Sequence, residues 1–243
     1  MHDDGYFGES IAAKYDEDSA EMFSPESVGP VVDFLANLAG AGRALELGIG
    51  TGRIALPLAQ RGVSVHGIEM SKAMLKQLLQ KPGGEDIDVT IGDFSSACVD
   101  GKFSVAYLVF NTIMNLTSQE AQTASFSNVA AHLEPGGYFV VEVMMPKIHE
   151  LAPGETVQQF KQASGRQGFD EYDVANQGLI SHHFRLRDGQ WEHHSIPFRY
   201  VWPAELNLMA EIAGMKLRER WSGWNREPFT SESQKFVGVW QKR

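Results

Sequence analysis

Cysteine is almost absent from this chain of 243 residues, and basic residues are fewer than acidic ones. Cys98 is the single cysteine, which excludes an intramolecular disulfide, and its neighbours predict a small buried side chain rather than a metal ligand. The 31 acidic residues against 21 Lys and Arg give a formal charge of -10. Because no basic patch offsets this charge, the composition disfavours a nucleic-acid partner.

Long apolar runs are missing as well. No stretch approaches the roughly 20 apolar residues that a membrane span requires, and the N-terminus has no basic segment followed by an apolar run. With 43% hydrophobic and 21% charged residues, the composition is that of a globular protein. We therefore expect a cytoplasmic protein with no membrane partner, built as one domain with an elaboration.

Strand and helix patterns alternate through the first 146 residues. Ser24 and Pro25 predict the start of a helix that ends at the glycines at 40 and 42. Thr117 and Glu120 predict the capping box of a later helix that reaches His132. Five strands between these helices predict a parallel sheet with right-handed crossovers, and we expect them near residues 43–48, 63–69, 87–91, 103–110 and 138–143.

The pattern changes after Met145. Residues 168–201 alternate at period two and contain Asp188-Gly189, a strong signal for a two-residue hairpin turn. That turn predicts a register, in which the facing pairs are Arg187 and Gln190, Leu186 and Trp191, Arg185 and Glu192, Phe184 and His193, and His183 and His194. A helix near 203–213 and strands near 215–220 and 235–241 follow. The fold class is therefore α/β, a doubly wound, seven-stranded, mostly parallel sheet with an inserted antiparallel flap.

A glycine-rich segment, Glu46-Leu-Gly48-Ile-Gly50-Thr-Gly52-Arg53, joins the first strand to a helix expected to start among these glycines. Glycines let backbone amides approach a ligand there, and a helix N-terminus supplies positive potential. The third glycine of a dinucleotide-binding fingerprint would fall on Arg53, so the spacing disfavours a nicotinamide cofactor.

Five segments in order resemble the motifs of class I S-adenosylmethionine-dependent methyltransferases, and the resemblance spans roughly residues 6 to 243. It implies a Rossmann-like fold and an enzyme that uses S-adenosylmethionine and releases S-adenosylhomocysteine. The segments that carry it are residues 45–53, 66–75, 91–94, 108–111 and 133–137.

The resemblance also implies which residues hold the cofactor. Glu69 would accept hydrogen bonds from the ribose hydroxyls, Met70 would pack on adenine, and Asp93 would accept from the adenine amino group. Each has a competing interpretation, a solvated strand-end acid for Glu69, core packing for Met70 and a turn residue for Asp93. The full predicted set is Tyr15, Glu46, Gly48, Gly50, Glu69, Met70, Asp93, Phe94 and Phe110.

Within the family, the chain resembles aminosugar N-methyltransferases and glycine N-methyltransferase-like members, on residues 13–16, 110–112 and 200–206 and on the inserted hairpin. Asn111 is followed by Thr112 and Ile113, unlike the Pro-Pro-aromatic pattern of many DNA and protein amide methylases. This departure favours a small-molecule acceptor.

Methyl transfer from a sulfonium is an in-line displacement, so alignment supplies much of the rate and no dedicated base is obligatory. Weak catalytic candidates are Asn111, His149 and Tyr15. The doublets His182-His183 and His193-His194 do not predict a metal site, because neighbours on a strand point to opposite faces.

These observations predict a methyltransferase that acts on N or O of a small molecule. A tRNA or protein methyltransferase with the same core, and a non-catalytic cofactor-binding scaffold, are the alternatives. We expect no nucleic-acid partner and leave a homodimer open. The expected division is a helical lid over residues 1–40, a core over 41–146 and 202–243, and an inserted antiparallel cap over 147–201.

Overall fold

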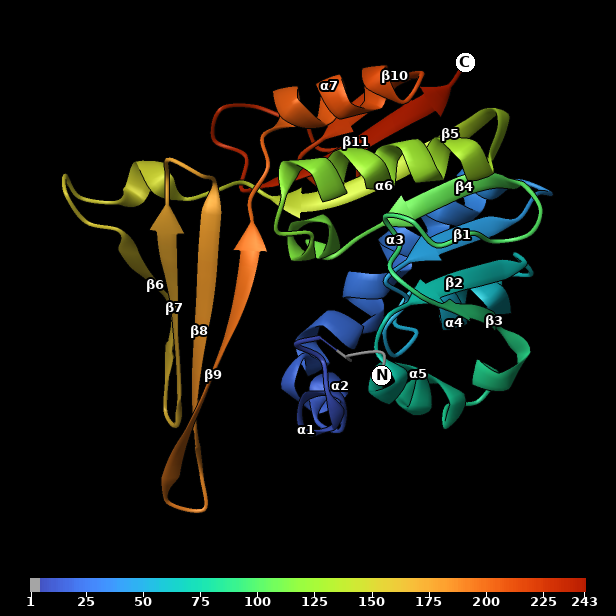
Figure 1. The fold of residues 1–243 in the computed structure, drawn as a ribbon. Helices are drawn as coiled ribbons and strands as arrows, with labels where there is room; N and C mark the ends of the chain where they lie inside the picture. Colours follow the sequence, from blue (N-terminus) through green and yellow to red (C-terminus); the bar gives the residue numbers. More distant parts are fainter. Residues whose placement is uncertain (1–4) are drawn as a thin grey trace.

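Seven strands form one sheet in the order β10-β11-β5-β4-β1-β2-β3 (Figure 1). The computed structural model describes residues 5–243. The five strands from β5 to β3 in this order are parallel, whereas β11 runs antiparallel to both its neighbours. This confirms the predicted sheet, whose strands are β1 (Ala44–Leu47), β2 (Val65–Glu69), β3 (Asp88–Ile91), β4 (Phe103–Leu108), β5 (Leu133–Met144), β10 (Met215–Trp221) and β11 (Lys235–Lys242).

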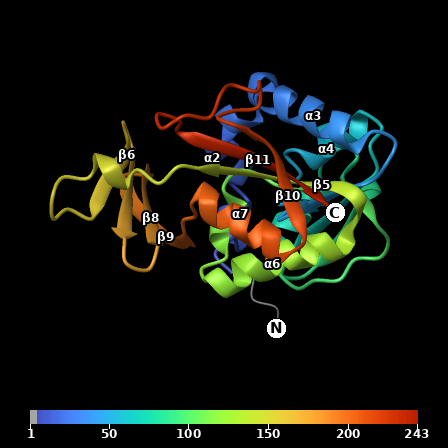
Figure 2. The same cartoon turned by 90° about the horizontal axis from the view of Figure 1, so that it is seen from above.

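Helices cover both faces of the sheet (Figure 2). One face packs against α3 (Pro25–Ala39), α4 (Ala55–Gln60) and α5 (Lys72–Leu79), and the other against α6 (Gln119–His132) and α7 (Pro203–Ile212). Side chains alternate along each strand, so Ala44 lies in the first apolar layer and Leu45 in the second. Each face of the sheet therefore has its own hydrophobic core.

Local signals set several helix ends. Ser24 caps α3 by accepting a hydrogen bond from the Ser27 amide at 3.3 Å, and Gly40 ends that helix with a φ of 56°, as predicted. The predicted cap of α6 is wrong by one residue. Ser118, not Thr117, has the extended backbone of a cap, and its hydroxyl accepts from the Ala121 amide at 3.1 Å.

Two further expectations are corrected. The helix after β1 begins at Ala55, later than expected, because Gly50 and Gly52 have left-handed φ values of 56° and 82° that an α-helix does not accept. Cys98 is exposed rather than buried, because it lies in the loop between β3 and β4.

The inserted segment forms a second, four-stranded antiparallel sheet, which we call the flap. Its two longest strands pair in the predicted register, including Arg185 opposite Glu192 and His183 opposite His194. Asp188 and Gly189 have φ values of 50° and 78°, the left-handed geometry of a two-residue hairpin turn. The flap strands are β6 (Val157–Ala163), β7 (Arg166–Asp173), β8 (Gly178–Arg187) and β9 (Gln190–Arg199).

Short elements complete the chain. Near the N-terminus, α1 (Glu9–Ala12) packs against α5, while α2 (Tyr15–Asp18) leads into η1 (Ala20–Phe23). Three more 3-10 turns are η2 (Gly84–Asp86), η3 (Thr112–Asn115) and η4 (Ile148–Glu150). Among residues 5–243, no helix has the length and apolar character needed to cross a membrane.

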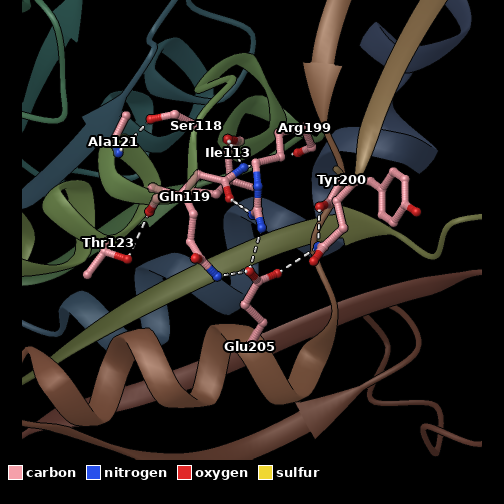
Figure 3. A network of polar contacts seen from close by, with 10 residues as sticks. Ile113, Ser118, Gln119, Ala121, Thr123, Arg199, Tyr200 and Glu205 are labelled. Atoms are coloured by element: carbon pink, nitrogen blue, oxygen red, sulfur yellow. Dashed lines mark hydrogen bonds and ion pairs between the residues drawn. The ribbon is translucent and has the colours of Figure 1, made fainter. Parts of the chain in front are cut away.

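A buried polar network joins the end of β9 to α6 and α7 (Figure 3). Arg199 bonds the Gln122 amide oxygen and donates to Glu205 Oε1 at 2.7 Å. Gln119 and Gln177 donate to the two oxygens of the same carboxylate at 2.7 and 2.9 Å. Burial opposes ionisation of Glu205, but these hydrogen bonds outweigh it and lower its pKa. The network attaches the flap to the core.

This network predicts a pH-dependent contribution to stability. A lowered pKa in the folded state stabilises the fold above the unfolded value of 4.5, and this contribution is lost as pH falls through the folded pKa. Glu205→Gln leaves the buried Arg199 charge uncompensated, so we expect the free energy of unfolding to fall by about 3 kcal/mol at pH 7. Urea titrations at pH 7 and pH 4 should show the deficit shrinking at the lower pH.

The control is Glu211→Gln, also on α7, where the side chain is 71% exposed and pairs loosely with Arg243. It should change stability little. An equal loss in the two variants would contradict a special role for Glu205.

Candidate active site

The carboxyl ends of β1 and β4 lie side by side at the point where the strand order reverses, the place where doubly wound sheets bind ligands. The glycine loop follows β1, and Gly48 has a φ of 68°. A Cβ on Gly48 would lie 2.7 Å from Thr112 Cγ2, so only glycine lets the loop approach the segment after β4 this closely. The predicted cofactor loop therefore lies at the switch point.

Glu69 ends β2 and joins two segments through its carboxylate. Oε2 accepts from the Gly50 amide and Oε1 from the Ser71 amide, both at 2.8 Å. Ser71 in turn donates its hydroxyl to the Phe7 carbonyl at 2.7 Å. Glu69 thus holds the glycine loop against the start of α5, with the N-terminal segment bonded alongside. A carboxylate is the kind of acceptor that a ribose diol would require.

Glu46 faces the apolar layer under α3 and α4, where it is only 4% exposed. Burial raises the pKa of Glu46 to about 8, and a hydrogen bond from Tyr107 and the charge of Arg53 offset part of that rise. The Tyr107 hydroxyl donates to Glu46 Oε2 at 2.9 Å. Below pH 8 this carboxyl is therefore mainly protonated, and a nearby cation would favour its ionisation.

The helix α2 covers this edge of the sheet. Tyr15 packs edge-on against Phe7, and burial, opposed by Arg53 and aided by Glu69 and Asp16, raises its pKa to about 12. Asp16 accepts from the Thr51 hydroxyl of the glycine loop at 2.6 Å and pairs with the Lys81 ammonium. The structure therefore places Tyr15 within electrostatic range of Glu69 and attaches its helix to the glycine loop.

The remaining predicted cofactor residues occupy the neighbouring strand ends. Asp93 follows β3, and its Oδ1 accepts a hydrogen bond from the Ser95 amide at 2.8 Å. Asp93 therefore stabilises a turn, and it also lies at the same edge of the sheet as the glycine loop. Phe94 lies 3.9 Å from a Cβ built on Gly48. Met70 is 42% exposed, so it is not core filler. The adenine contacts expected of these residues stay predictions.

The corner after β4 has an unusual backbone. Phe110 and Asn111 are consecutive residues with left-handed φ values of 61° and 64°. The Arg53 guanidinium lies 4.7 Å from the Phe110 ring centroid, and Asn111 Oδ1 accepts from the Met144 amide at 2.6 Å. Such strain is typical of functional sites and persists only where neighbours hold it.

Glu142 is the neighbour that holds this corner, and sequence reasoning missed it. Its Oε2 accepts from the Phe110 amide and its Oε1 from the Trp224 indole, both at 2.9 Å. The signal was present, because Glu142 is the one charged residue in the apolar run of residues 138–143.

His149 does not join these residues. It lies on η4, between β5 and the flap, and its side chain is 67% exposed. Glu150 is its nearest charged partner, 4.0 Å away. Within residues 5–243, no three His, Cys, Asp or Glu side chains gather as metal ligands would.

The arrangement fits a cationic nucleoside-like ligand. Three buried carboxyl groups lie at or near the carboxyl ends of β1, β2 and β5, on Glu46, Glu69 and Glu142, with exposed fractions of 4%, 8% and 9%. Glu69 bonds the loop of glycine amides, and Glu142 bonds the strained aromatic corner. A diol, an amino group and a positive centre would each find a matching acceptor here.

Comparison with known proteins agrees with this geometry. Residues 44–137 match a family model described as a methyltransferase domain. The chain is 35% identical to the CcbJ methyltransferase from Streptomyces caelestis, with 99% of each chain covered and a TM-score of 0.88. It is 28% identical, over the whole of both chains, to a cypemycin N-terminal methyltransferase from Streptomyces sp.

A third likeness concerns the fold alone. The amino pentose methyltransferase CalS10 from Micromonospora echinaspora, solved with S-adenosylmethionine bound, has a TM-score of 0.67. It is 18% identical, with 90% of this chain and 91% of that chain covered.

Glu69 generates the first prediction for the site. In Glu69→Gln the new NH₂ group faces one of the two backbone amides and cannot accept a hydrogen bond from it. Both the bond that holds the glycine loop and the expected contact with the ribose should therefore weaken. We expect S-adenosylmethionine affinity to fall about 10- to 100-fold, the scale of hydrogen bonds to a charged group. Isothermal calorimetry measures this, and unchanged affinity would remove Glu69 from the cofactor site.

Glu46 generates a pH prediction of opposite sign to that of Glu205. A carboxyl whose folded pKa lies above the unfolded value stabilises the fold fully below pH 4.5 and loses that contribution as pH rises through about 8. Glu46 should therefore lower the melting temperature of the cofactor-free protein between pH 5 and pH 8, relative to a protein without this acid. Glu46→Gln, which cannot ionise, should remove most of that fall, and an identical slope in both proteins would contradict the buried neutral acid.

Proposed function

The chain belongs to the class I S-adenosylmethionine-dependent methyltransferases, and on that basis we propose that it methylates an amine nitrogen of a small molecule by in-line displacement. When bound, S-adenosylmethionine supplies a methyl group on a positively charged sulfur. The residues at the carboxyl edge of the sheet would bind, orient and shield the reacting groups, since alignment accounts for much of the rate in such displacements.

The three buried carboxyl groups carry this proposal. Glu69 and Glu142, joined by Glu46 once a bound cation favours its ionisation, would create a negative environment at the ends of their strands. A cationic cofactor, and an amine that becomes cationic on methylation, are both stabilised by such an environment. Binding of a cation would also lower the pKa of Glu46, so that ionisation and binding favour each other.

Nitrogen is favoured over oxygen as the acceptor. A hydroxyl is a weak nucleophile unless a base removes its proton, whereas an amine attacks once solvent has deprotonated it. Tyr15, with a pKa near 12, is a poor base at neutral pH, and the exposed His149 lies apart on η4. Asn111 offers a carboxamide that can orient the acceptor and cannot take a proton.

A peptide amino terminus is the second candidate acceptor. The full-length relative that is 28% identical is named for methylating the N-terminus of cypemycin. A tRNA acceptor finds less support, because the net charge of -10 opposes binding of a phosphate backbone. For the same site we propose that residues 147–201 act as the acceptor-side cap and that the expected lid ends before α3, at residue 23, because α3 packs on the sheet as part of the core.

A panel of acceptors tests the proposal. The protein with S-adenosylmethionine is incubated with small primary and secondary amines, their hydroxyl analogues, a short peptide with a free amino terminus and a tRNA transcript. We expect S-adenosylhomocysteine and a product 14 mass units heavier, by the added CH₂, with amines only. Glu69→Gln, weakened in cofactor binding, should lower the rate for every acceptor. Transfer to the peptide, the RNA or the alcohols, but not to the amines, would overturn the proposal.

A further inference from the structure

One face of the flap is attached to the body of the molecule at both ends, and we call it the inner face. At its base, Tyr172 and Leu179 belong to the core cluster that includes Met114 of η3. At its tip, Arg185 and Arg187 pair with Asp18 of α2. Paired residues of an antiparallel sheet, and residues two apart on one strand, share a face. The residues between base and tip must therefore also be directed toward the body.

The base of this face adjoins the candidate site. The strand β9 packs against η3, which begins directly after Asn111. The tip meets α2, whose first residue, Tyr15, packs on the start of α5 and is near enough to Glu69 for that charge to raise its pKa. Figure 1 shows the flap standing opposite α1 and α2 along this edge of the sheet. The middle of the inner face thus lies between the β4 corner and the lid.

Two neighbouring cross-strand pairs with polar residues lie in that middle, and we call each such pair a rung. Asp170 is paired with Ser181, and both are buried, at 7% and 6% exposed. The Ser181 hydroxyl lies 3.2 Å from His183 Nε2, and it lowers the pKa of the facing Asp170 carboxyl as a hydrogen-bond donor does. His183 is paired with Gly168 and stacks on His194, with ring centroids 5.3 Å apart. Nothing in the family motifs or in the cofactor site uses this row of buried polar groups.

The single hydroxyl proton of Ser181 determines which groups in this row donate hydrogen bonds and which accept them. Ser181 has one proton, so when it donates to Asp170, His183 must donate from Nε2 to the serine oxygen. Burial lowers the pKa of His183 to about 4, with His194 and Arg166 adding to the effect. The ring is therefore neutral at pH 7, and its Nδ1 is an acceptor. Burial raises the pKa of Asp170, yet its carboxyl still offers a second oxygen.

The adjacent rung decides which donor suits this row. Arg166 pairs with Arg185 in the register, and Arg187 follows two residues later on the same face. Asp18 and Glu192 pair with Arg185 and Arg187, and the one guanidinium charge left in excess disfavours an ammonium group beside the row. A neutral hydroxyl, which both donates and accepts, fits the acceptors of Asp170 and His183 without adding charge.

We propose that Asp170, Ser181 and His183 form an acceptor subsite that binds a hydroxyl group of the methylated amine. The assignment rests on the proposed N-methylation and adds the residues that select the acceptor. Asp170 is then a specificity-determining residue on the flap, distant in sequence from every cofactor motif. The acceptor it selects is an amine that bears a hydroxyl on a neighbouring carbon.

Two matched amines test the subsite, trans-2-aminocyclohexanol and cyclohexylamine, which differ by one hydroxyl. The wild-type protein should methylate the amino alcohol with a kcat/KM about 10- to 100-fold higher, the scale of a hydrogen bond to a charged group. Asp170→Asn should reduce that preference to about threefold or less, because an amide is a weaker acceptor. It should leave kcat/KM for cyclohexylamine and calorimetric affinity for S-adenosylmethionine unchanged.

Glu171→Gln is the matched control, since Glu171 is the next residue on β7, on the opposite face, with a half-exposed side chain. It should keep the wild-type preference. If Asp170→Asn has a lower melting temperature than the wild-type protein, Ser181→Ala replaces it as the test variant. Ser181→Ala should also weaken the preference for the amino alcohol.

The outcomes separate the two proposals. Methylation of both amines with equal kcat/KM by the wild-type protein overturns the subsite alone. A preference that survives both Asp170→Asn and Ser181→Ala, or an equal loss for both amines, overturns it as well. If S-adenosylmethionine binds but neither these amines nor any in the wider panel is methylated, the proposed function fails, and the subsite fails with it.

Discussion

The carboxylate of Glu69 is the contact on which the site depends. A charged group at the end of a buried parallel strand must be hydrogen-bonded, and Glu69 meets that need with two backbone amides from different segments. One amide, of Gly50, belongs to the glycine loop, and the other, of Ser71, begins α5. The same serine bonds the Phe7 carbonyl. A single buried acid thus joins the loop to the helix and to the segment that covers them.

The segment Tyr15–Asp18 extends this connection to the flap. Asp16 bonds Thr51 in the glycine loop, while Asp18 pairs with the flap arginines. One turn of helix therefore contacts both the glycine loop and the flap. At the opposite end of the flap, Arg199 and Glu205 attach β9 to the helices behind the sheet. The flap is held at two points, which gives its inner face a defined position.

Sequence reasoning succeeded where a short segment carries its own structural requirement. Asp188-Gly189 predicts a hairpin register because few residues accept two successive left-handed conformations, and the structure has that register. It failed where neighbours compete or where burial depends on the whole fold. Thr117 and Ser118 are both good caps, and only the backbone shows that Ser118 is used. Cys98 looks like a core residue in isolation but lies in an exposed loop.

The sequence by itself determined the strand order along the chain, the glycine loop, the flap register and the family, because these depend on local periodicity and on motifs of a few residues. Only the tertiary structure showed that Glu142 supports the strained corner of Phe110 and Asn111, since the two segments are about thirty residues apart. Only the tertiary structure also shows that Asp170 and His183 face the body of the molecule. Strand alternation predicts which residues share a face, but attachment at both ends of the flap decides which face is buried.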